Sequence, residues 1–197
     1  AKIKATRALI IAGNAAREEV LPGLGIRLKY IPAREFLAEY EATPEDEEVK
    51  ALAGELIGRA KQLVRVTQQD VLNGIRSYVV ARRLLRREEC DAISMDCLGA
   101  LGHTKVSLPC IAWSKMNDDG VPAACEADLG AVATHVMVQS LFDRPGFQQD
   151  PVAETARGAI VGAHCSCPTR LDGFESEGAE YDIVPHHGAR DATRRPV

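Results

Sequence analysis

The sequence lacks the features that place a protein in a membrane or on nucleic acid. Its longest hydrophobic runs, such as Ala8 to Ala12, are too short to cross a bilayer and shorter than the core of a signal peptide. Lys and Arg number 24 and Asp and Glu 28, so the net charge of −4 gives no strong attraction for nucleic acid. We therefore expect a cytoplasmic protein with no membrane partner and no nucleic-acid partner.

Cysteines are too few for a disulfide-stabilised scaffold, with six in 197 residues, so we expect free thiols. The Cys-x-Cys pair of Cys165 and Cys167 has no second knuckle, whereas a structural zinc site typically uses paired Cys-x2-Cys knuckles. Small buried cysteines are the favoured interpretation. A zinc protein that uses His164, Cys165 and Cys167 is a weaker alternative.

Nucleotide-binding motifs are also missing. Gly13, Gly23 and Gly25 do not have the spacing of a dinucleotide-binding loop, and no Gly-Lys-Ser or Gly-Lys-Thr phosphate loop is present. A Rossmann-like arrangement without these motifs gives no reason to infer a cofactor. The sequence therefore predicts no nucleotide site.

Strands and helices alternate along most of the chain. Short apolar runs closed by turn residues predict buried strands at Ala8 to Ala12, Asp91 to Asp96 and Val121 to Cys125. One helix is predicted from Thr43, as its capping residue, to about Val64, and a second from Thr67 to Arg87. The apolar spacing between Leu129 and Leu141 indicates a further helix.

This alternation predicts an α/β fold. We expect residues 1–146 to form a Rossmann-like three-layer domain with a mostly parallel sheet. After Arg144-Pro145-Gly146 the pattern changes to short apolar pieces, such as Ala159 to Ala163, separated by turn residues. Residues 147–197 are therefore expected to form a separate, β-rich domain.

Acidic residues mark the junction between the last predicted strand and the helix after it. Glu126 and Asp128 can cap that helix, or they can face the crevice where α/β sheets bind ligands. Asp150 lies just past the predicted boundary, and His164 follows another apolar run. Glu126, Asp150 and His164 could together form an oxygen-rich site for Mn²⁺ or Mg²⁺.

Several motifs between residues 91 and 168 resemble the L-fucose isomerase and L-arabinose isomerase superfamily. They are Pro109-Cys110, Asn117-Asp118-Asp119-Gly120, Ala124-Cys125-Glu126-Ala127-Asp128, Gly146-Phe147 leading to Asp150, and Ala163-His164-Cys165. Asp150 follows Glu126 by 24 positions and His164 follows Asp150 by 14, intervals close to those between the family's metal-binding residues. Order and spacing together carry the resemblance, because each motif alone is weak.

The resemblance implies a Mn²⁺-dependent aldose–ketose isomerase that acts on a monosaccharide and assembles as a homo-oligomer, a trimer or a hexamer. Glu126 and Asp150 would be metal ligands and the acid/base pair, and His164 a further ligand. The reaction moves a carbonyl from C1 to C2 through an enediol, which requires proton removal at one carbon and delivery at the other. A metal that holds two sugar oxygens stabilises the charge that develops.

The chain departs from the family pattern at both ends. The family has a domain before the α/β domain and a later histidine ligand, and the sequence shows neither. The resemblance therefore implies a central domain plus the start of a barrel-like C-terminal domain, residues 147–197, that is incomplete here. His186 and His187 come too early to be that ligand and are expected to line the substrate side. A non-catalytic sugar-binding or interaction module of the same fold is the alternative function.

Overall fold

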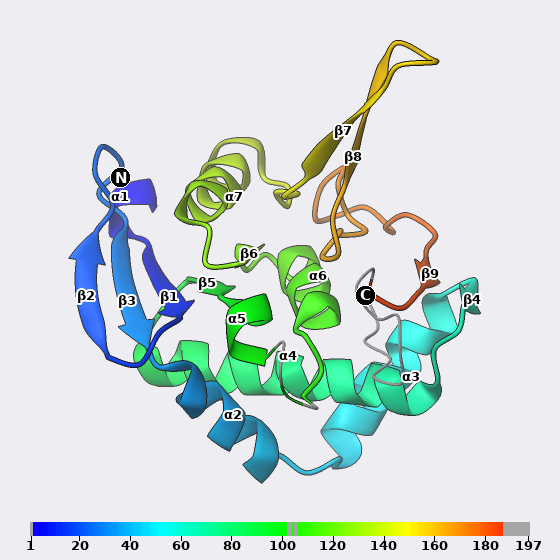
Figure 1. The fold of residues 1–197 in the computed structure, drawn as a ribbon, viewed down its shortest axis with the longest axis horizontal. Coiled ribbons are helices and arrows are strands. Elements are labelled where there is room, and N and C mark those ends of the chain that lie inside the picture. Colours follow the sequence, from blue (N-terminus) through cyan, green and yellow to red (C-terminus); the bar gives the residue numbers. More distant parts are fainter. Residues whose placement is uncertain (1, 102–103, 105, 187–197) are drawn as a thin grey trace.

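A five-stranded sheet with the order β2-β3-β1-β5-β6 forms the centre of the molecule (Figure 1). The computed structural model describes residues 2–101, 104 and 106–186. The strands of this sheet are β1 (Arg7–Ile11), β2 (Arg17–Val20), β3 (Arg27–Ile31), β5 (Ala92–Met95) and β6 (Ala123–Cys125). β1 runs parallel to β3 and β5, β5 runs parallel to β6, and only the edge strand β2 is antiparallel. The prediction of a mostly parallel sheet is confirmed.

Helices cover both faces of the sheet, because successive side chains of a strand point to opposite faces. Leu9 and Ile11 of β1 belong to one buried cluster, and Ala8 and Ile10 belong to the other. The first cluster includes side chains of α2 (Ala33–Ala42), α3 (Glu47–Arg59), α4 (Gln68–Glu88), α5 (Cys97–Leu101) and α6 (Cys110–Asp118). The second includes side chains of α1 (Lys2–Ala5) and α7 (Leu129–Phe142). The α/β expectation thus holds, with helices on each side of the sheet.

The two helix starts predicted from capping residues have different outcomes. Thr67 begins α4 with a capping box, in which its hydroxyl accepts from the Asp70 backbone while the Asp70 carboxylate accepts from the Thr67 backbone. The prediction that Thr43 caps the next helix upstream is wrong. Asp46 caps α3 by accepting from Val49, and Thr43 ends the unpredicted helix α2 with its hydroxyl on the Glu39 carbonyl. Thr43 and Asp46 both have side chains that can accept a capping hydrogen bond, and Asp46, the later of the two, begins the helix.

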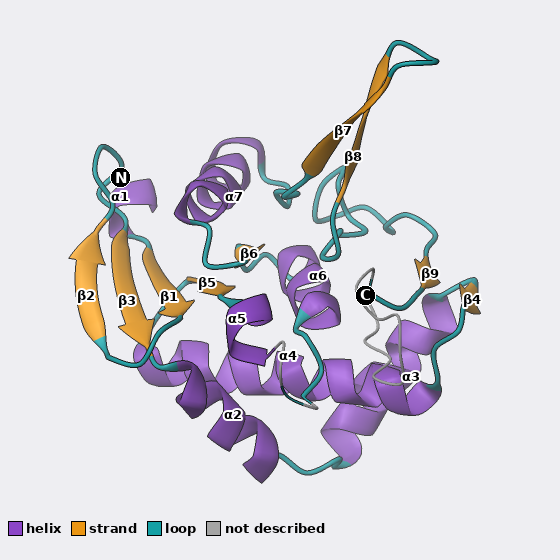
Figure 2. Cartoon of the chain, viewed as in Figure 1, coloured by secondary structure: helices purple, strands orange, loops and turns teal. Residues whose placement is uncertain are grey.

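The chain beyond residue 146 forms an antiparallel hairpin of β7 (Asp150–Glu154) and β8 (Ala159–Ala163), which projects away from the body of the molecule (Figures 1 and 2). The segment after the hairpin returns to the α/β unit. There β9 (Asp182–Ile183) pairs in parallel with β4 (Gln62–Leu63), and Ile183 is buried in the larger cluster. The described residues contain β structure in this region but no closed barrel.

The residues Asn117-Asp118-Asp119-Gly120 are of the kinds typical of a turn, but Asn117 is buried at the end of α6 and holds the first residue of β6. Its amide group donates to the Ala123 carbonyl at 2.8 Å and accepts from the Ala123 N–H at 3.0 Å. We expect Asn117→Ala to lower the free energy of unfolding by about 3 kcal/mol, because both backbone groups lose their buried partner. Urea unfolding measures the change. Asn14→Ala, at an exposed position, is the control and should change stability little; equal losses in the two variants would contradict this role.

Candidate functional site

The carboxyl ends of β5 and β6 lie at the sheet edge where this topology places ligands. β1 pairs with β3 on one side and with β5 on the other, so the chain reverses its direction of winding at β1. Open α/β sheets bind ligands outside the carboxyl ends of the strands at such a reversal. Cys97 follows β5 after one residue, Cys125 ends β6 and Glu126 comes next. Chemically versatile side chains therefore stand where the fold predicts a site.

Glu126 occupies a strained turn between β6 and α7. Glu126 and Ala127 have φ values of 65° and 52°, so two successive non-glycine residues are left-handed. Such conformations cost energy and are concentrated at functional sites. The Glu126 side chain is exposed, whereas Asp128 caps α7 by accepting from the Ala131 N–H at 3.0 Å. The capping interpretation therefore holds for Asp128, and Glu126 is left at the sheet edge.

Asp150 and His164 stand at the base of the hairpin. Asp150 pairs with Ala163, the residue before His164, so both site residues lie where the two strands begin and end. The Gln148 side chain accepts from the Cys125 N–H at 2.9 Å, which ties this base to the end of β6. The Asp150 side chain is exposed and His164 is half-buried.

Electrostatics link the three residues predicted from the sequence. The pKa of His164 is raised above its ordinary value, first by a hydrogen bond with the Cys165 thiol and then by the charges of Cys165, Asp150 and Glu126, while burial opposes the rise. Both carboxylates thus act on the imidazole. Among the described residues, however, no set of three metal-ligating side chains with donor atoms within 4.8 Å of one another includes Glu126 or Asp150.

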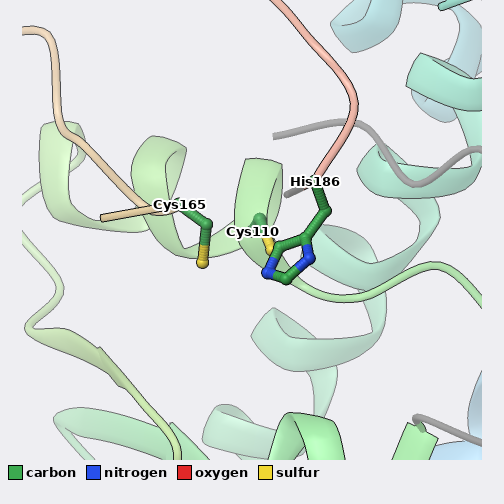
Figure 3. A group of neighbouring side chains, drawn as sticks. All are labelled: Cys110, Cys165 and His186. Atoms are coloured by element: carbon green, nitrogen blue, oxygen red, sulfur yellow. The ribbon is translucent and has the colours of Figure 1, made fainter. Parts of the chain in front are cut away.

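The tightest groups of potential ligands combine Cys165, named in the zinc alternative, with residues that the sequence did not indicate as metal ligands. Both groups are built around Cys165: one adds Cys110 and His186, the other Cys125 and His164. In each group the donor atoms all lie within 4.8 Å of one another. Figure 3 shows the first group gathered from three separate segments of the chain. A soft-ligand cluster therefore adjoins the predicted oxygen-rich site.

Cys165 is the thiol of this cluster that most favours the thiolate form. Its pKa is strongly lowered, first by hydrogen bonds with the Cys110 and Cys125 thiols and then by His164 and His186, against the effect of burial. The pKa values of Cys110 and Cys125 are raised because these thiols donate to Cys165 and are buried. One sulfur with this character is a good ligand for a soft metal and a good nucleophile.

Of the weaker zinc alternative, the structure brings together His164 and Cys165 but not Cys167. Cys167 is exposed, so the favoured interpretation of small buried cysteines is wrong for this residue. Its sulfur donates to the Pro168 carbonyl at 3.4 Å. All six cysteines are free thiols. The signal that could have pointed to the cluster is the position of Cys125 at the carboxyl end of a parallel strand. His187, also named from the sequence, lies outside the described residues.

A cavity of about 350 Å³ opens beside the cluster, between α3, α6 and the segments 164–170 and 179–184. His164 and Cys165 lie in its wall, together with charged side chains of both signs. Asp118 shapes this wall by accepting from the N–H and hydroxyl of Thr169 and from the N–H of Arg170, at 2.7–2.9 Å. A small polar molecule thus has room and hydrogen-bonding groups next to His164.

No known protein family and no curated protein matches the chain. Within the described ranges, no helix combines the length and the apolar character needed to cross a membrane.

Proposed function

We propose that the protein is a divalent-metal-dependent aldose–ketose isomerase of the fucose/arabinose isomerase type, with Glu126, Asp150 and His164 as its metal site. The observation that supports this most is the tie between the hairpin base, which carries Asp150 and His164, and the end of β6, which Glu126 follows. β6 is the parallel strand at the edge of the sheet, and the tie is the hydrogen bond from the Cys125 N–H to the Gln148 side chain. His164 lines the polar cavity. Two carboxylates and one imidazole suit Mn²⁺, or alternatively Mg²⁺.

Glu126, Asp150 and His164 form a loose donor set. Glu126 and Asp150 are both exposed, and neither belongs to a tight ligand group among the described residues. Two carboxylates repel each other until a cation offsets their charge. The strained turn at Glu126 and the hairpin base at Asp150 keep the two side chains close to His164.

The chemistry divides between the two carboxylates. A bound divalent ion would polarise the sugar carbonyl and hold two sugar oxygens. One carboxylate removes the proton from the carbon next to the carbonyl and returns a proton to the former carbonyl carbon, while the other moves the hydroxyl proton from one sugar oxygen to the other. His164 would be a further ligand of the ion, and the polar groups of the cavity wall at Asp118, Thr169 and Arg170 are available to the sugar hydroxyls. Glu126 and Asp150 thus each have two roles, as metal ligand and as acid or base, and His164 is a ligand.

An assay for ketose formation tests the proposal. After removal of metals with EDTA, the protein is incubated with a panel of free aldoses, including L-fucose and L-arabinose, with and without Mn²⁺. We expect ketose to form only when Mn²⁺ is present. Binding of a sugar without turnover would support the alternative, a non-catalytic sugar-binding or interaction module, and absence of both would reject both functions.

The homo-oligomer, a trimer or a hexamer with a barrel-like continuation after the hairpin, is part of this proposal. The hairpin leaves Val152, Ile160 and Val161 exposed to 61%, 77% and 51%. Val152 and Val161 are paired on one face and Ile160 lies on the other, so both faces are apolar. An isolated two-stranded hairpin is only marginally stable in water. A second copy of the chain, or further chain of the same subunit, would cover these faces.

Charged substitutions on the hairpin test the assembly. We expect the double variant Val152→Lys with Ile160→Lys to reduce the mass measured by light scattering from a multiple of the 21.3 kDa chain to that of one chain. Two buried lysines in an interface would be strongly unfavourable. Val20→Lys, equally exposed at 61% on β2, is the control and should keep the wild-type mass. A monomeric wild-type protein would reject the self-association.

A further inference from the structure

Three donor groups outside the predicted isomerase site are arranged as metal ligands. The sulfurs of Cys110 and Cys165 and a ring nitrogen of His186 lie within 4.8 Å of one another (Figure 3). In a tetrahedral zinc site, Zn–S bonds of about 2.3 Å and Zn–N bonds of about 2.0–2.1 Å place the donors roughly 3.5–3.8 Å apart. Small inward movements of these side chains would therefore fill three of the four tetrahedral positions and leave the fourth to water.

The segments that carry these ligands are fixed by contacts of their own. Cys110 is the first residue of α6, which packs on α4 so closely that Ile111 touches the position a Cβ of Gly74 would occupy. After Cys165, the chain is held by the three hydrogen bonds to Asp118 and by Ser114, whose hydroxyl donates to the Cys167 carbonyl at 2.6 Å. The ligands are thus positioned by the fold before any ion binds.

The pairing of β9 with β4 positions His186, the last described residue. It follows β9, which is hydrogen-bonded in parallel to β4, and the Ile183 side chain anchors β9 in the main core. The three ligands come from α6, from the segment after β8 and from the segment after β9. An ion bound by them would join the returning segment 164–186 to the α/β unit.

We propose that Cys110, Cys165 and His186 form a zinc site, separate from the oxygen-rich site of Glu126, Asp150 and His164. Two thiolates and an imidazole select Zn²⁺ over Mn²⁺, because soft ligands are poor for manganese. The set shares no residue with the proposed isomerase site, so both sites can be occupied at once. The second group, with Cys125 and His164, competes for Cys165 but would take His164 from the isomerase site.

The proposal revises the expectation of no structural zinc drawn from the Cys-x-Cys spacing. That spacing pairs Cys165 with Cys167, which is exposed and lies in neither ligand group. The structure instead pairs Cys165 with Cys110, 55 positions earlier in the chain, and with His186. Because metal binding couples to folding, Zn²⁺ should stabilise the attachment of segment 164–186.

Metal titration of the full chain tests the site. Protein freed of metal under reducing, anaerobic conditions is titrated with Co²⁺ and then with Zn²⁺ in competition with a coloured chelator. We expect one tight equivalent, with the tetrahedral Co²⁺ spectrum and sulfur-to-cobalt absorption, and a higher Tm when Zn²⁺ is bound. Cys165→Ser and His186→Gln should each weaken Zn²⁺ binding by about 100-fold or more, because losing a direct ligand costs at least as much as the 10–100-fold that losing an outer-shell partner costs.

Matched variants identify the ligands. Cys167→Ser and Cys90→Ser should bind Zn²⁺ like the wild type, since both sulfurs are outside the two groups. If Cys165→Ser does not fold, as judged by circular dichroism, His186→Gln at a half-buried position decides the question. The proposal fails if wild-type protein takes up no tight Zn²⁺, if Cys167→Ser is as weak as Cys165→Ser, or if His164→Gln removes binding while His186→Gln does not. Glu126→Gln should leave Zn²⁺ binding unchanged, which separates this test from that of the isomerase.

Discussion

Replacing Glu126 with glutamine is expected to lower kcat for ketose formation by about 10²–10⁴-fold, the range that a positioned acid or base contributes. Glutamine keeps the size of the side chain but has no charge and cannot accept the substrate proton. Mn²⁺ affinity should fall as well, because one of two carboxylate ligands is lost. The left-handed backbone at residue 126 is unchanged in the variant, so the free energy of unfolding should stay near the wild-type value.

Asp128→Asn is the matched control for this experiment. Asp128 is also acidic and lies two positions further along, but its carboxylate caps α7. Asparagine caps helices about as well as aspartate, so both stability and turnover should be retained. Equal losses of activity in the Glu126 and Asp128 variants would show that charge at this turn acts nonspecifically. Full activity of Glu126→Gln would remove Glu126 from the catalytic residues.

Acid is expected to destabilise the protein through His135, which is 2% exposed in the middle of α7. Its Nδ1 lies 3.2 Å from the side-chain oxygen of Asn117, Oδ1, and donates to it. Its Nε2 has no partner in the described structure. The ring packs so closely on Gly146 that a Cβ there would come within 2.8 Å of it. Burial first, and the nearby His164 second, lower the pKa of His135 to about 4.

The direction of the pH effect follows from this lowered pKa. Between pH about 6.5 and 4 the unfolded chain binds a proton at His135 that the folded protein does not bind. The contribution of neutral His135 to the free energy of unfolding is therefore fully present above pH 6.5 and decreases as the pH falls toward 4. The loss from this one group is about 3 kcal/mol, since each unit of pKa difference corresponds to about 1.4 kcal/mol.

Urea unfolding at a series of pH values between 4 and 7.5 measures this loss. His135→Gln has no titrating ring at this position. Over the same pH interval its free energy of unfolding should therefore change by about 3 kcal/mol less than that of the wild type, even if glutamine lowers stability at neutral pH. The comparison of slopes separates the proton effect from the packing effect. Parallel pH profiles for the two proteins would show that another group causes the acid sensitivity.

The fold was predictable where local signals agree with each other. The capping pair of Thr67 and Asp70 gave the start of α4, and short apolar runs gave β1 and β5, since these features depend only on neighbours in the chain. The start of α3 was missed because Thr43 and Asp46 can both cap a helix, and tertiary packing decided between them. Asn117 gave a turn signal, but its role in holding β6 depends on contacts across the core.

The site was predictable only in part, for the same physical reason. Glu126 follows a strand, and that position alone indicates the ligand-binding edge of a parallel sheet. The thiol cluster could not be predicted from spacing, because Cys110, Cys165 and His186 come together only through the packing of α6 on α4 and the pairing of β9 with β4. The residue nearest in sequence, Cys167, proved to be on the surface.

The pairing of β4 with β9 also sets an order for how the chain acquires its structure. It joins Gln62 to Asp182, 120 positions apart, and contacts that close such long loops form late because their entropic cost must be met first. During synthesis the segments that form α6 and β6 leave the ribosome before residues 164–186, because the chain emerges N-terminus first. We therefore expect Cys110 and Cys125 to be exposed to the solvent before Cys165 can reach them, and the cluster around Cys165 to assemble late in folding.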